Sequence, residues 1–258
     1  QEKLFYEVCY FDNKKNYLCE IILTIFEENK IIQNKVVLSD DTIHSYPQVI
    51  KVSDGKYILS ITNNGKSPKI FELKKNELIF KNIPINENIM DATYFYHDEL
   101  YYMIGTDYSL KGDGNLRIFY GKDPTKDMFI EHPSSPIKYG KNQNRISGSI
   151  FKMNNKIYRF AMNNEKEYGE YLNLYEILEL NKTKFSEKLI KNNFLLNTNL
   201  PNNIKKYHHI SLKDSNYEGG GEIEFLMDGA NISYISMHAK KFLIRMISLN
   251  NIYLIIKI

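Results

Sequence analysis

The chain has 258 residues, 43% of them hydrophobic, and a formal net charge of +3. Its Lys, Arg, Asp and Glu residues are interspersed, which argues against a nucleic-acid-binding protein, because such a protein gathers its positive charge in a patch. With 20 Tyr and 14 Phe there is ample apolar material for a large core. Because the composition does not break, we predict a single domain over residues 1–258.

The first predicted strands are Leu4–Tyr10, Tyr17–Phe26 and Lys30–Val37, which are rich in β-branched and aromatic residues. The chain starts without Met and inside a strand, so we expect the innermost strand of this unit to precede residue 1. This leaves the compartment open, with the cytoplasm favoured over export. Cys9 and Cys19 could face each other across the first hairpin, but in a chain of this length we expect buried thiols.

A pattern of two apolar residues, five mostly polar residues and an aromatic strand recurs along the chain. Its copies start near residues 46, 91 and 147 and align Val49-Ile50, Tyr94-Phe95 and Ile150-Phe151. Such spacing, with several short strands in each repeat, is typical of propeller blades. We therefore predict an all-β fold: a five-bladed β-propeller with about four strands per blade, closed jointly by the two chain ends. A sandwich or a barrel is the alternative.

Later segments complete this organisation. The connection His132–Pro136 is expected to run extended over the surface, and the glycine-containing Lys111–Asn115 is expected to be a turn, because no helix follows it. The aliphatic spacing in Tyr171–Leu180 is compatible with a helix, but the β-rich surroundings favour a strand. Lys205–Ser211 is expected to open the fifth blade. No apolar run is long enough to span a bilayer.

Polar residues stand at the predicted starts of the innermost strands, which converge on one axis in a propeller. Polar groups withdrawn from water need partners, so these residues either satisfy one another or bind a ligand. Arg145 could hold an anionic or polyhydroxyl ligand, or bridge to a carboxylate such as Asp91. Glu7 is either an acid near the centre or a solvated edge residue. The residues at these starts are Tyr46, Asp91, Arg145, Ser147 and His208 or His209.

No metal site or cofactor site is predicted. His208 and His209 are adjacent, and neighbouring residues of a strand point to opposite faces. The chain has no Cys/His cluster for zinc and no Gly-x-Ser-x-Gly elbow for a serine nucleophile.

Short motifs follow one another over nearly the whole chain. The more specific ones are Ser45-Tyr46-Pro47 and Asp91-Ala92-Thr93; the others are Phe5-Tyr6-Glu7, Leu116–Tyr120, His132-Pro133 with Arg145 and Gly148, and Tyr168-Gly169. Together they resemble the propeller domain at the N-terminus of plant glucosamine inositolphosphorylceramide transferases and in bacterial glycan-biosynthesis proteins. That domain is in turn similar to the five-bladed arabinanase, xylosidase and levansucrase glycosidases.

The resemblance implies roles for carboxylates. In those glycosidases a first-blade Asp is the base or nucleophile, a later Asp tunes acidity, and a Glu protonates the leaving group. Asp91 matches the tuning Asp, whereas Ile146-Ser147-Gly148 stands where the fourth-blade Glu would be. Glycoside hydrolysis normally uses two carboxylates. Glu7, Glu167 or Glu170 is the candidate for the second one.

Two functional interpretations follow. The favoured one is a glycoside hydrolase-like enzyme acting on a cell-surface glycan or polysaccharide; the alternative is a non-catalytic glycan-binding or scaffolding domain associated with a glycosyltransferase. Aromatic surface, a carboxylate and fixed donors suit a sugar ligand. The predicted catalytic residues are Asp91 and Glu7, and the predicted sugar-binding residues are His44, Tyr46, Thr93, Asp107, Arg117, Arg145, Ser147, Tyr168, His208 and His209.

Overall fold

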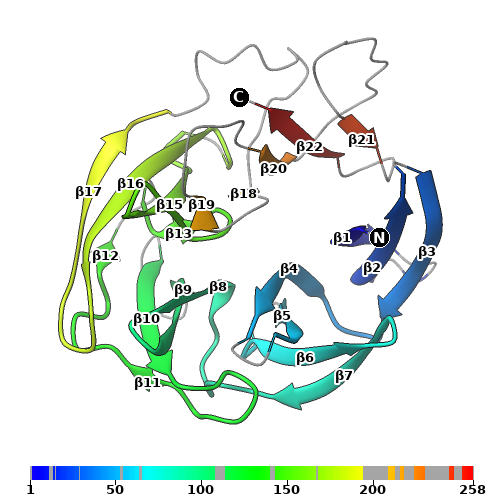
Figure 1. Ribbon diagram of the computed structural model, residues 1–258, viewed down its shortest axis with the longest axis horizontal. Coiled ribbons are helices and arrows are strands. Elements are labelled where there is room, and N and C mark those ends of the chain that lie inside the picture. The colour runs from blue at the N-terminus through cyan, green and yellow to red at the C-terminus, as the bar shows by residue number, and fades with distance from the viewer. Residues whose placement is uncertain are drawn as a thin grey trace.

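The protein is a five-bladed β-propeller, as predicted: five sheets surround a common centre (Figure 1). Every regular element in the described part of the chain is a strand. This part therefore contains no helix that is long and apolar enough to cross a membrane. The computed structural model describes residues 2–11, 14, 16–28, 30–52, 55–63, 66–107, 114–139, 143–166 and 168–193, and the segments 209–212, 216–217, 224–229, 244–246 and 252–257.

The first two blades are antiparallel sheets whose strands follow one another in chain order. Blade 1 has three strands and blade 2 has four, with β1 and β4 nearest the centre (Figure 1). Blade 1 consists of β1 (Glu2–Phe11), β2 (Tyr17–Glu27) and β3 (Lys30–Leu38), and blade 2 of β4 (His44–Lys51), β5 (Tyr57–Asn63), β6 (Lys69–Lys74) and β7 (Glu77–Asn82).

Blades 3 and 4 add short strands to this plan. In blade 3 the order is β11-β10-β9-β8 with β12 beside β10, and in blade 4 it is β17-β16-β15-β14-β19 with β13 beside β15. Their strands are β8 (Met90–His97), β9 (Leu100–Asp107), β10 (Asn115–Gly121), β11 (Ile130–Glu131), β12 (Lys138–Tyr139), β13 (Arg145–Ile146), β14 (Phe151–Met153), β15 (Lys156–Asn163), β16 (Tyr171–Leu180), β17 (Phe185–Lys191) and β19 (Asn216–Tyr217). The strand predicted at residues 171–180 is confirmed.

Blade 5 lies between blades 4 and 1 in the ring (Figure 1). It has the order β18-β20-β22-β21 and shares no strand with blade 1 in the described part of the chain. These strands do not test the predicted closure shared by the two chain ends, which stays a prediction. They are β18 (His209–Leu212), β20 (Glu224–Gly229), β21 (Ile244–Met246) and β22 (Ile252–Lys257).

The first hairpin is cross-linked. Cys9 on β1 pairs directly with Cys19 on β2, and the two side chains form a disulfide across the sheet. Directly opposed residues of an antiparallel pair lie on the same face and within reach of each other. The expectation of two buried thiols is therefore wrong, because the register of the hairpin brings both sulfur atoms together.

The core consists of separate apolar clusters, one at each described interface between neighbouring blades. Strand β9 shows how these clusters are built. Tyr101 and Met103 belong to the cluster between blades 2 and 3, whereas Tyr102 and Ile104 belong to the cluster between blades 3 and 4. Side chains of a strand alternate between its two faces. A strand whose two faces pack against different neighbouring blades must therefore be apolar on both faces. This explains why the whole of β9 is buried.

Candidate functional site

The innermost strands of blades 2 and 3 carry a β-bulge at the same place in the repeat. The register shifts within residues 45–48 of β4 and within residues 90–93 of β8, and each bulge contains a residue with positive φ: Tyr46 at 52° and Asp91 at 55°. In blade 4, Gly148 has φ 106° between β13 and β14. A non-glycine residue in this conformation costs about 1–3 kcal/mol, and such residues persist only where their surroundings hold them.

Glu7 holds the first of these bulges. The bulge takes the Tyr46 N–H out of the sheet ladder, and this group donates a hydrogen bond of 2.7 Å to the Glu7 carboxylate on β1. The carboxylate thereby joins blade 1 to blade 2. Glu7 therefore lies at the blade 1–blade 2 junction and accepts a main-chain hydrogen bond there; it is not a solvated edge residue.

The Tyr46 hydroxyl connects three blades. It accepts a hydrogen bond of 2.7 Å from the Gly148 N–H of blade 4 and lies 3.0 Å from the Thr93 hydroxyl of blade 3. Since the Gly148 N–H fills one acceptor position of the phenol, the phenol's own hydrogen is available to Thr93. Thr93 lies in turn 3.2 Å from the Asp91 carbonyl oxygen, to which it can donate. Tyr46, Thr93 and Asp91 are all buried.

Asp91 and Arg145 form an ion pair between blades 3 and 4. The Arg145 Nε donates to the Asp91 carboxylate at 2.5 Å, and the exposed fractions of the two side chains are 13% and 3%. The guanidinium lies over the Tyr168 ring, 4.9 Å from its centroid. Of the two roles weighed for Arg145, the bridge to Asp91 is the one present in the structure.

The electrostatics of this cluster keep Tyr46 neutral. Burial raises the pKa of Tyr46 well above its ordinary value, and the charge of Asp91 adds to this rise. Hydrogen bonds with Thr93 and Gly148 and the charge of Arg145 act in the opposite direction without reversing it. Tyr46 is therefore a hydroxyl donor and acceptor, and not a base, near neutral pH.

The other predicted residues lie in separate arrangements. His44 is buried, and its Nε2 lies 2.8 Å from the Asp40 carboxylate. Burial lowers the pKa of His44, although the charge of Asp40 acts to raise it. Ser147 is buried at the blade 4 end of the cluster, where its N–H donates to the Phe160 carbonyl.

Arg117 and Asp107 form their own network on the second and third strands of blade 3. The Arg117 guanidinium contacts three carboxylates, those of Glu87, Asp107 and Glu131, at 2.6–2.7 Å. Burial disfavours the charge of Arg117, but these carboxylates, Glu131 foremost, outweigh burial and raise its pKa. Three acidic neighbours make this group a structural cross-link between blade 3 and the segment that connects β7 to β8.

Several predicted residues have little or no described environment. His208 and Glu167 lie outside the described residues, and His209 begins β18 with no described side-chain surroundings. Glu170, the remaining candidate acid, lies 4.0 Å from the Lys166 ammonium group. His132 departs from the predicted surface connection: it is buried, and its Nε2 lies 2.7 Å from the Asn181 carbonyl oxygen.

Gln48 is a residue of this region that the sequence reasoning missed. Its amide makes two hydrogen bonds with the main chain of Tyr94, accepting from the N–H at 2.7 Å and donating to the carbonyl oxygen at 3.1 Å. It thereby fixes β4 against β8 just after both bulges. A polar residue at an inward position between the buried Tyr46 and Ile50 is the signal that could have revealed it.

No group of three or more His, Cys, Asp and Glu side chains suited to a metal ion occurs among the residues that the structure describes. The side-chain chemistry of the cluster consists of one ion pair, one engaged carboxylate, and neutral hydroxyls. This arrangement can fix strands in place and can present hydrogen-bonding groups to a ligand.

Solved structures share this fold. An α-L-arabinofuranosidase from Podospora anserina, determined in complex with cellotriose, has a TM-score of 0.65 at 8% sequence identity, over 99% of this chain and 86% of its own. An α-L-arabinanase from Cellvibrio cellulosa has a TM-score of 0.51 at 15% identity, over 72% of this chain and 73% of its own. At these identities the likeness shows the fold alone. A search of curated protein sequences found no match.

The family described as glucosamine inositolphosphorylceramide transferase 1, N-terminal, matches residues 27–229. This range includes β3 to β20 and the residues of the cluster except Glu7. The chain therefore belongs to the family of the N-terminal domain of glucosamine inositolphosphorylceramide transferase 1.

Proposed function

We propose that this chain is a non-catalytic, glycan-binding propeller that works with a glycosyltransferase in glycan biosynthesis. The observation that carries this proposal is the engagement of the two candidate catalytic carboxylates. Asp91 is paired with Arg145 at 2.5 Å, and Glu7 accepts the Tyr46 N–H at 2.7 Å. Glycoside hydrolysis requires one carboxyl group to give up a proton and another to act as a base or nucleophile. Here the Glu7 carboxylate binds the main chain of blade 2, and the Asp91 carboxylate binds the Arg145 guanidinium of blade 4.

The glycan would bind over Tyr168 and Arg145. The Tyr168 ring is 43% exposed and lies against the Arg145 guanidinium, which leaves an aromatic face beside a charged donor. Sugars present C–H faces that pack on aromatic rings and hydroxyls that need hydrogen-bonding partners. In this proposal Asp91 orients Arg145, and Tyr46, Thr93 and Ser147 hold the bulges in place.

The partnership with a glycosyltransferase rests on the family. Its description names the N-terminal part of a transferase, which supports a domain that accompanies a catalytic one. We propose that residues 1–258 act as a single domain in this role. Function belongs to the site and not to the scaffold, so the arabinanase-like fold does not by itself favour hydrolysis.

A glycan array tests binding, with three forms of the protein: wild type, Tyr168→Ala and Tyr96→Ala. Tyr96 is 51% exposed and lies near the end of β8, whereas Asp91 lies at the start of the same strand. It is therefore a matched control, an exposed tyrosine away from the proposed site. We expect wild type and Tyr96→Ala to bind the same glycan and Tyr168→Ala to lose at least about fivefold in affinity, since an aromatic side chain stacked on a nucleic-acid base contributes about 1–3 kcal/mol and a sugar face should stack comparably. Equal binding by all three would contradict this site.

The rival function, glycoside hydrolysis, is tested by incubating wild type and Asp91→Asn with aryl glycosides and surface-glycan fragments. We expect no turnover by either form. Turnover by wild type that Asp91→Asn abolishes would replace the binding proposal with a hydrolase.

A further inference from the structure

Two exposed aromatic rings lie in contact at the tip of the first hairpin. Phe11 at the end of β1 pairs with Tyr17 at the start of β2, and their ring centroids lie 5.2 Å apart. The exposed fractions are 71% for Phe11 and 49% for Tyr17. Single exposed apolar residues are ordinary, whereas apolar groups gathered together on a surface mark a site of interaction. The hairpin tip is therefore a candidate binding surface.

This hairpin tip lies at the same end of the propeller as the bulges of Tyr46 and Asp91. Cys19 of β2 forms a parallel bridge with Ile43, the residue before β4, so β2 begins at the end where β4 begins. The antiparallel strand β1 therefore finishes at that end. Both rings thus belong to the end of the propeller that carries the cluster around Tyr46.

One row of side chains connects the rings to the bulge of blade 2. Alternate residues of a strand share a face, so Glu7, Cys9 and Phe11 stand in a row that extends over about 13 Å. Glu7 accepts the Tyr46 N–H at 2.7 Å. Burial raises the pKa of Tyr17 and the negative charge of Glu7 raises it further, so these two side chains are near neighbours. The ring pair is therefore continuous with the cluster.

The disulfide holds the ring pair in position. Cys9 and Cys19 are the next directly opposed pair on the same face of the hairpin, two positions from Phe11 and Tyr17. Aromatic side chains with two χ angles also offer a large contact area at a low cost in conformational entropy. A surface that is fixed before binding loses less entropy when a ligand arrives.

Tyr168 lies at this same end in blade 4. It belongs to the connection between β15 and β16, and its neighbour Arg145 pairs with Met162 close to the end of β15. Arg145 also binds Asp91, which lies at the start of β8. Blade 5 lies between blades 4 and 1 in the ring (Figure 1). Two exposed aromatic surfaces thus occupy one end of the propeller, on different blades.

We propose that Phe11 and Tyr17 form a second glycan subsite, which binds a sugar residue further along the chain than the one at Tyr168. This inference rests on the proposed glycan-binding function. Aromatic rings pack on the C–H faces of sugars, and the Tyr17 hydroxyl adds a donor and acceptor for sugar hydroxyls. Because the two surfaces belong to different blades, the ligand that contacts both is an oligosaccharide.

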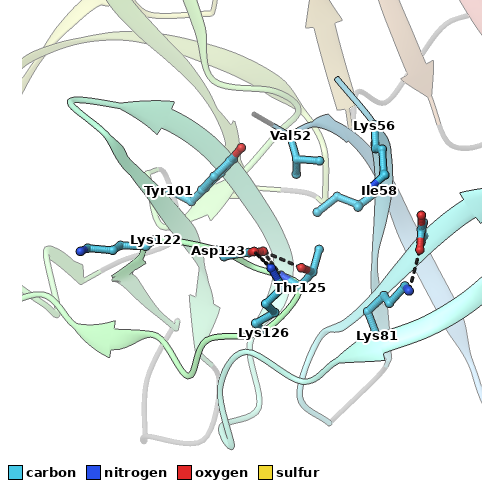
Figure 2. A pocket seen from close by; sticks show the side chains of 10 residues that line it. Val52, Lys56, Ile58, Lys81, Tyr101, Lys122, Asp123, Thr125 and Lys126 are labelled. Atoms are coloured by element: carbon cyan, nitrogen blue, oxygen red, sulfur yellow. Dashed lines mark hydrogen bonds and ion pairs between the residues drawn. The ribbon is translucent and has the colours of Figure 1, made fainter. Parts of the chain in front are cut away.

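Controls for this subsite come from parts of the molecule away from the hairpin tip. A pocket of about 380 Å³ between blades 2 and 3 opens at the other end of the propeller, beside the turn from β4 to β5 (Figure 2). Lys56 and Ile58 line it, and Tyr57 between them is 50% exposed, close to the value of Tyr17. Phe80 on the outer strand β7 is 53% exposed. Tyr57→Ala and Phe80→Ala therefore remove similar exposed rings elsewhere.

Isothermal titration calorimetry tests the subsite with gluco-, manno- and galacto-oligosaccharides, from monosaccharides to hexasaccharides. Phe11→Ala and Tyr17→Ala should each weaken binding of the longer oligosaccharides by at least about fivefold, the lower end of what a ring stacked on a nucleic-acid base contributes. They should leave binding of the shortest bound sugars unchanged, whereas Tyr168→Ala should weaken binding at every length. Tyr57→Ala and Phe80→Ala should bind like wild type. A folding defect would weaken every length alike, so a loss confined to longer chains identifies the subsite.

A fluorescent variant reports on the hairpin tip directly. The chain contains no Trp, so Phe11→Trp gives the protein a single indole at the proposed subsite. An indole also packs on sugar faces, so this variant should bind the longer oligosaccharides at least as tightly as wild type, and its emission should change as they bind. Phe80→Trp is the control and should bind without a change in emission. A change in Phe80→Trp but not in Phe11→Trp would place the sugar elsewhere and overturn the subsite.

The outcomes separate this inference from the function on which it rests. If Tyr168→Ala weakens binding and Phe11→Ala and Tyr17→Ala do not at any length, the subsite is overturned and the glycan-binding function stands. Binding that depends on Phe11 and Tyr17 but not on Tyr168 supports the subsite and contradicts the site at Tyr168. Failure of wild type to bind any of these sugars overturns both proposals. Loss of binding to phosphatidylcholine–phosphatidylserine vesicles in Phe11→Ala would then assign the rings to a membrane surface.

Discussion

The Tyr46 hydroxyl of blade 2 accepts a hydrogen bond of 2.7 Å from the Gly148 N–H of blade 4, across a sequence distance of 102 residues. The same hydroxyl lies 3.0 Å from the Thr93 hydroxyl of blade 3. One oxygen atom thus satisfies buried groups of two other blades. Buried polar groups that lose a partner carry the full cost of their desolvation.

Tyr46→Phe should therefore destabilise the protein by about 1–3 kcal/mol, because the buried Gly148 N–H loses its acceptor. For a domain of this size the thermal midpoint should fall by about 2–4 °C per kcal/mol. Tyr96→Phe, at an exposed tyrosine, is the control and should leave the midpoint unchanged. A Tyr46→Phe protein as stable as wild type would show that the three-blade connection contributes nothing.

Asp91 and Arg145 should be energetically coupled. Asp91→Ala leaves the Arg145 charge in a largely buried place, and breaking a buried pair in this way costs about 3–5 kcal/mol. The double variant Asp91→Ala/Arg145→Met should be less destabilised than the sum of the single variants. A double-mutant cycle by urea denaturation measures the difference, and strict additivity would mean that the pair does not interact.

The disulfide should stabilise the first hairpin. Cys9 and Cys19 are 10 positions apart, and closing a loop of this length constrains the unfolded chain by about 2–3 kcal/mol in the chain-entropy description. Cys9→Ser/Cys19→Ser should lose about that much stability in urea. Intact-mass measurement before and after alkylation checks the premise, since free thiols would gain two alkyl groups without prior reduction.

Stability should fall on mild acidification, in part through His44. Burial holds the pKa of His44 below its ordinary value of 6.5, so below pH 6.5 the unfolded chain binds a proton that the folded protein excludes until its lower pKa is reached. His44 therefore contributes stability above pH 6.5 that is lost as the pH falls towards its folded pKa. His44→Gln should reduce the slope of unfolding free energy between pH 7 and pH 5, by at most about 1.4 kcal/mol per pH unit. Identical slopes for both proteins would contradict this.

Gly105→Ala should be strongly destabilising. A Cβ atom at Gly105 would lie 2.2 Å from the Ile89 Cγ2 and 3.0 Å from the Met90 carbonyl oxygen, next to the bulge of β8. Overpacking of this kind typically costs about 1–3 kcal/mol. Gly55→Ala is a useful comparison, because nothing lies within 4 Å of a Cβ atom there and its φ of 79° tests backbone strain alone. A Gly105→Ala protein with the thermal midpoint of wild type would show that β8 moves aside freely.

The repeat at residues 46, 91 and 147 predicted the propeller because each copy opens a blade, and two of the three copies coincide with a bulge. The pairing of Asp91 with Arg145 was foreseen as one of two roles, since both residues were expected at the axis. The positive φ of Tyr46 could not be foreseen, because an aromatic residue gives no local sign of that conformation. The pocket between blades 2 and 3 was also missed. Its lining residues come from five separate segments, and only the docking of blade 2 against blade 3 brings them together.

The double-sided burial of β9 determines how the molecule can open. Because its two faces belong to different apolar clusters, β9 cannot be exposed without separating blade 3 from both neighbours. Its amide hydrogens should then exchange with solvent only when the protein unfolds globally, whereas those of β3, whose side chains are mostly exposed, should exchange through local opening. The outer strands of the propeller would thus open first, and the apolar interfaces between neighbouring blades would separate last.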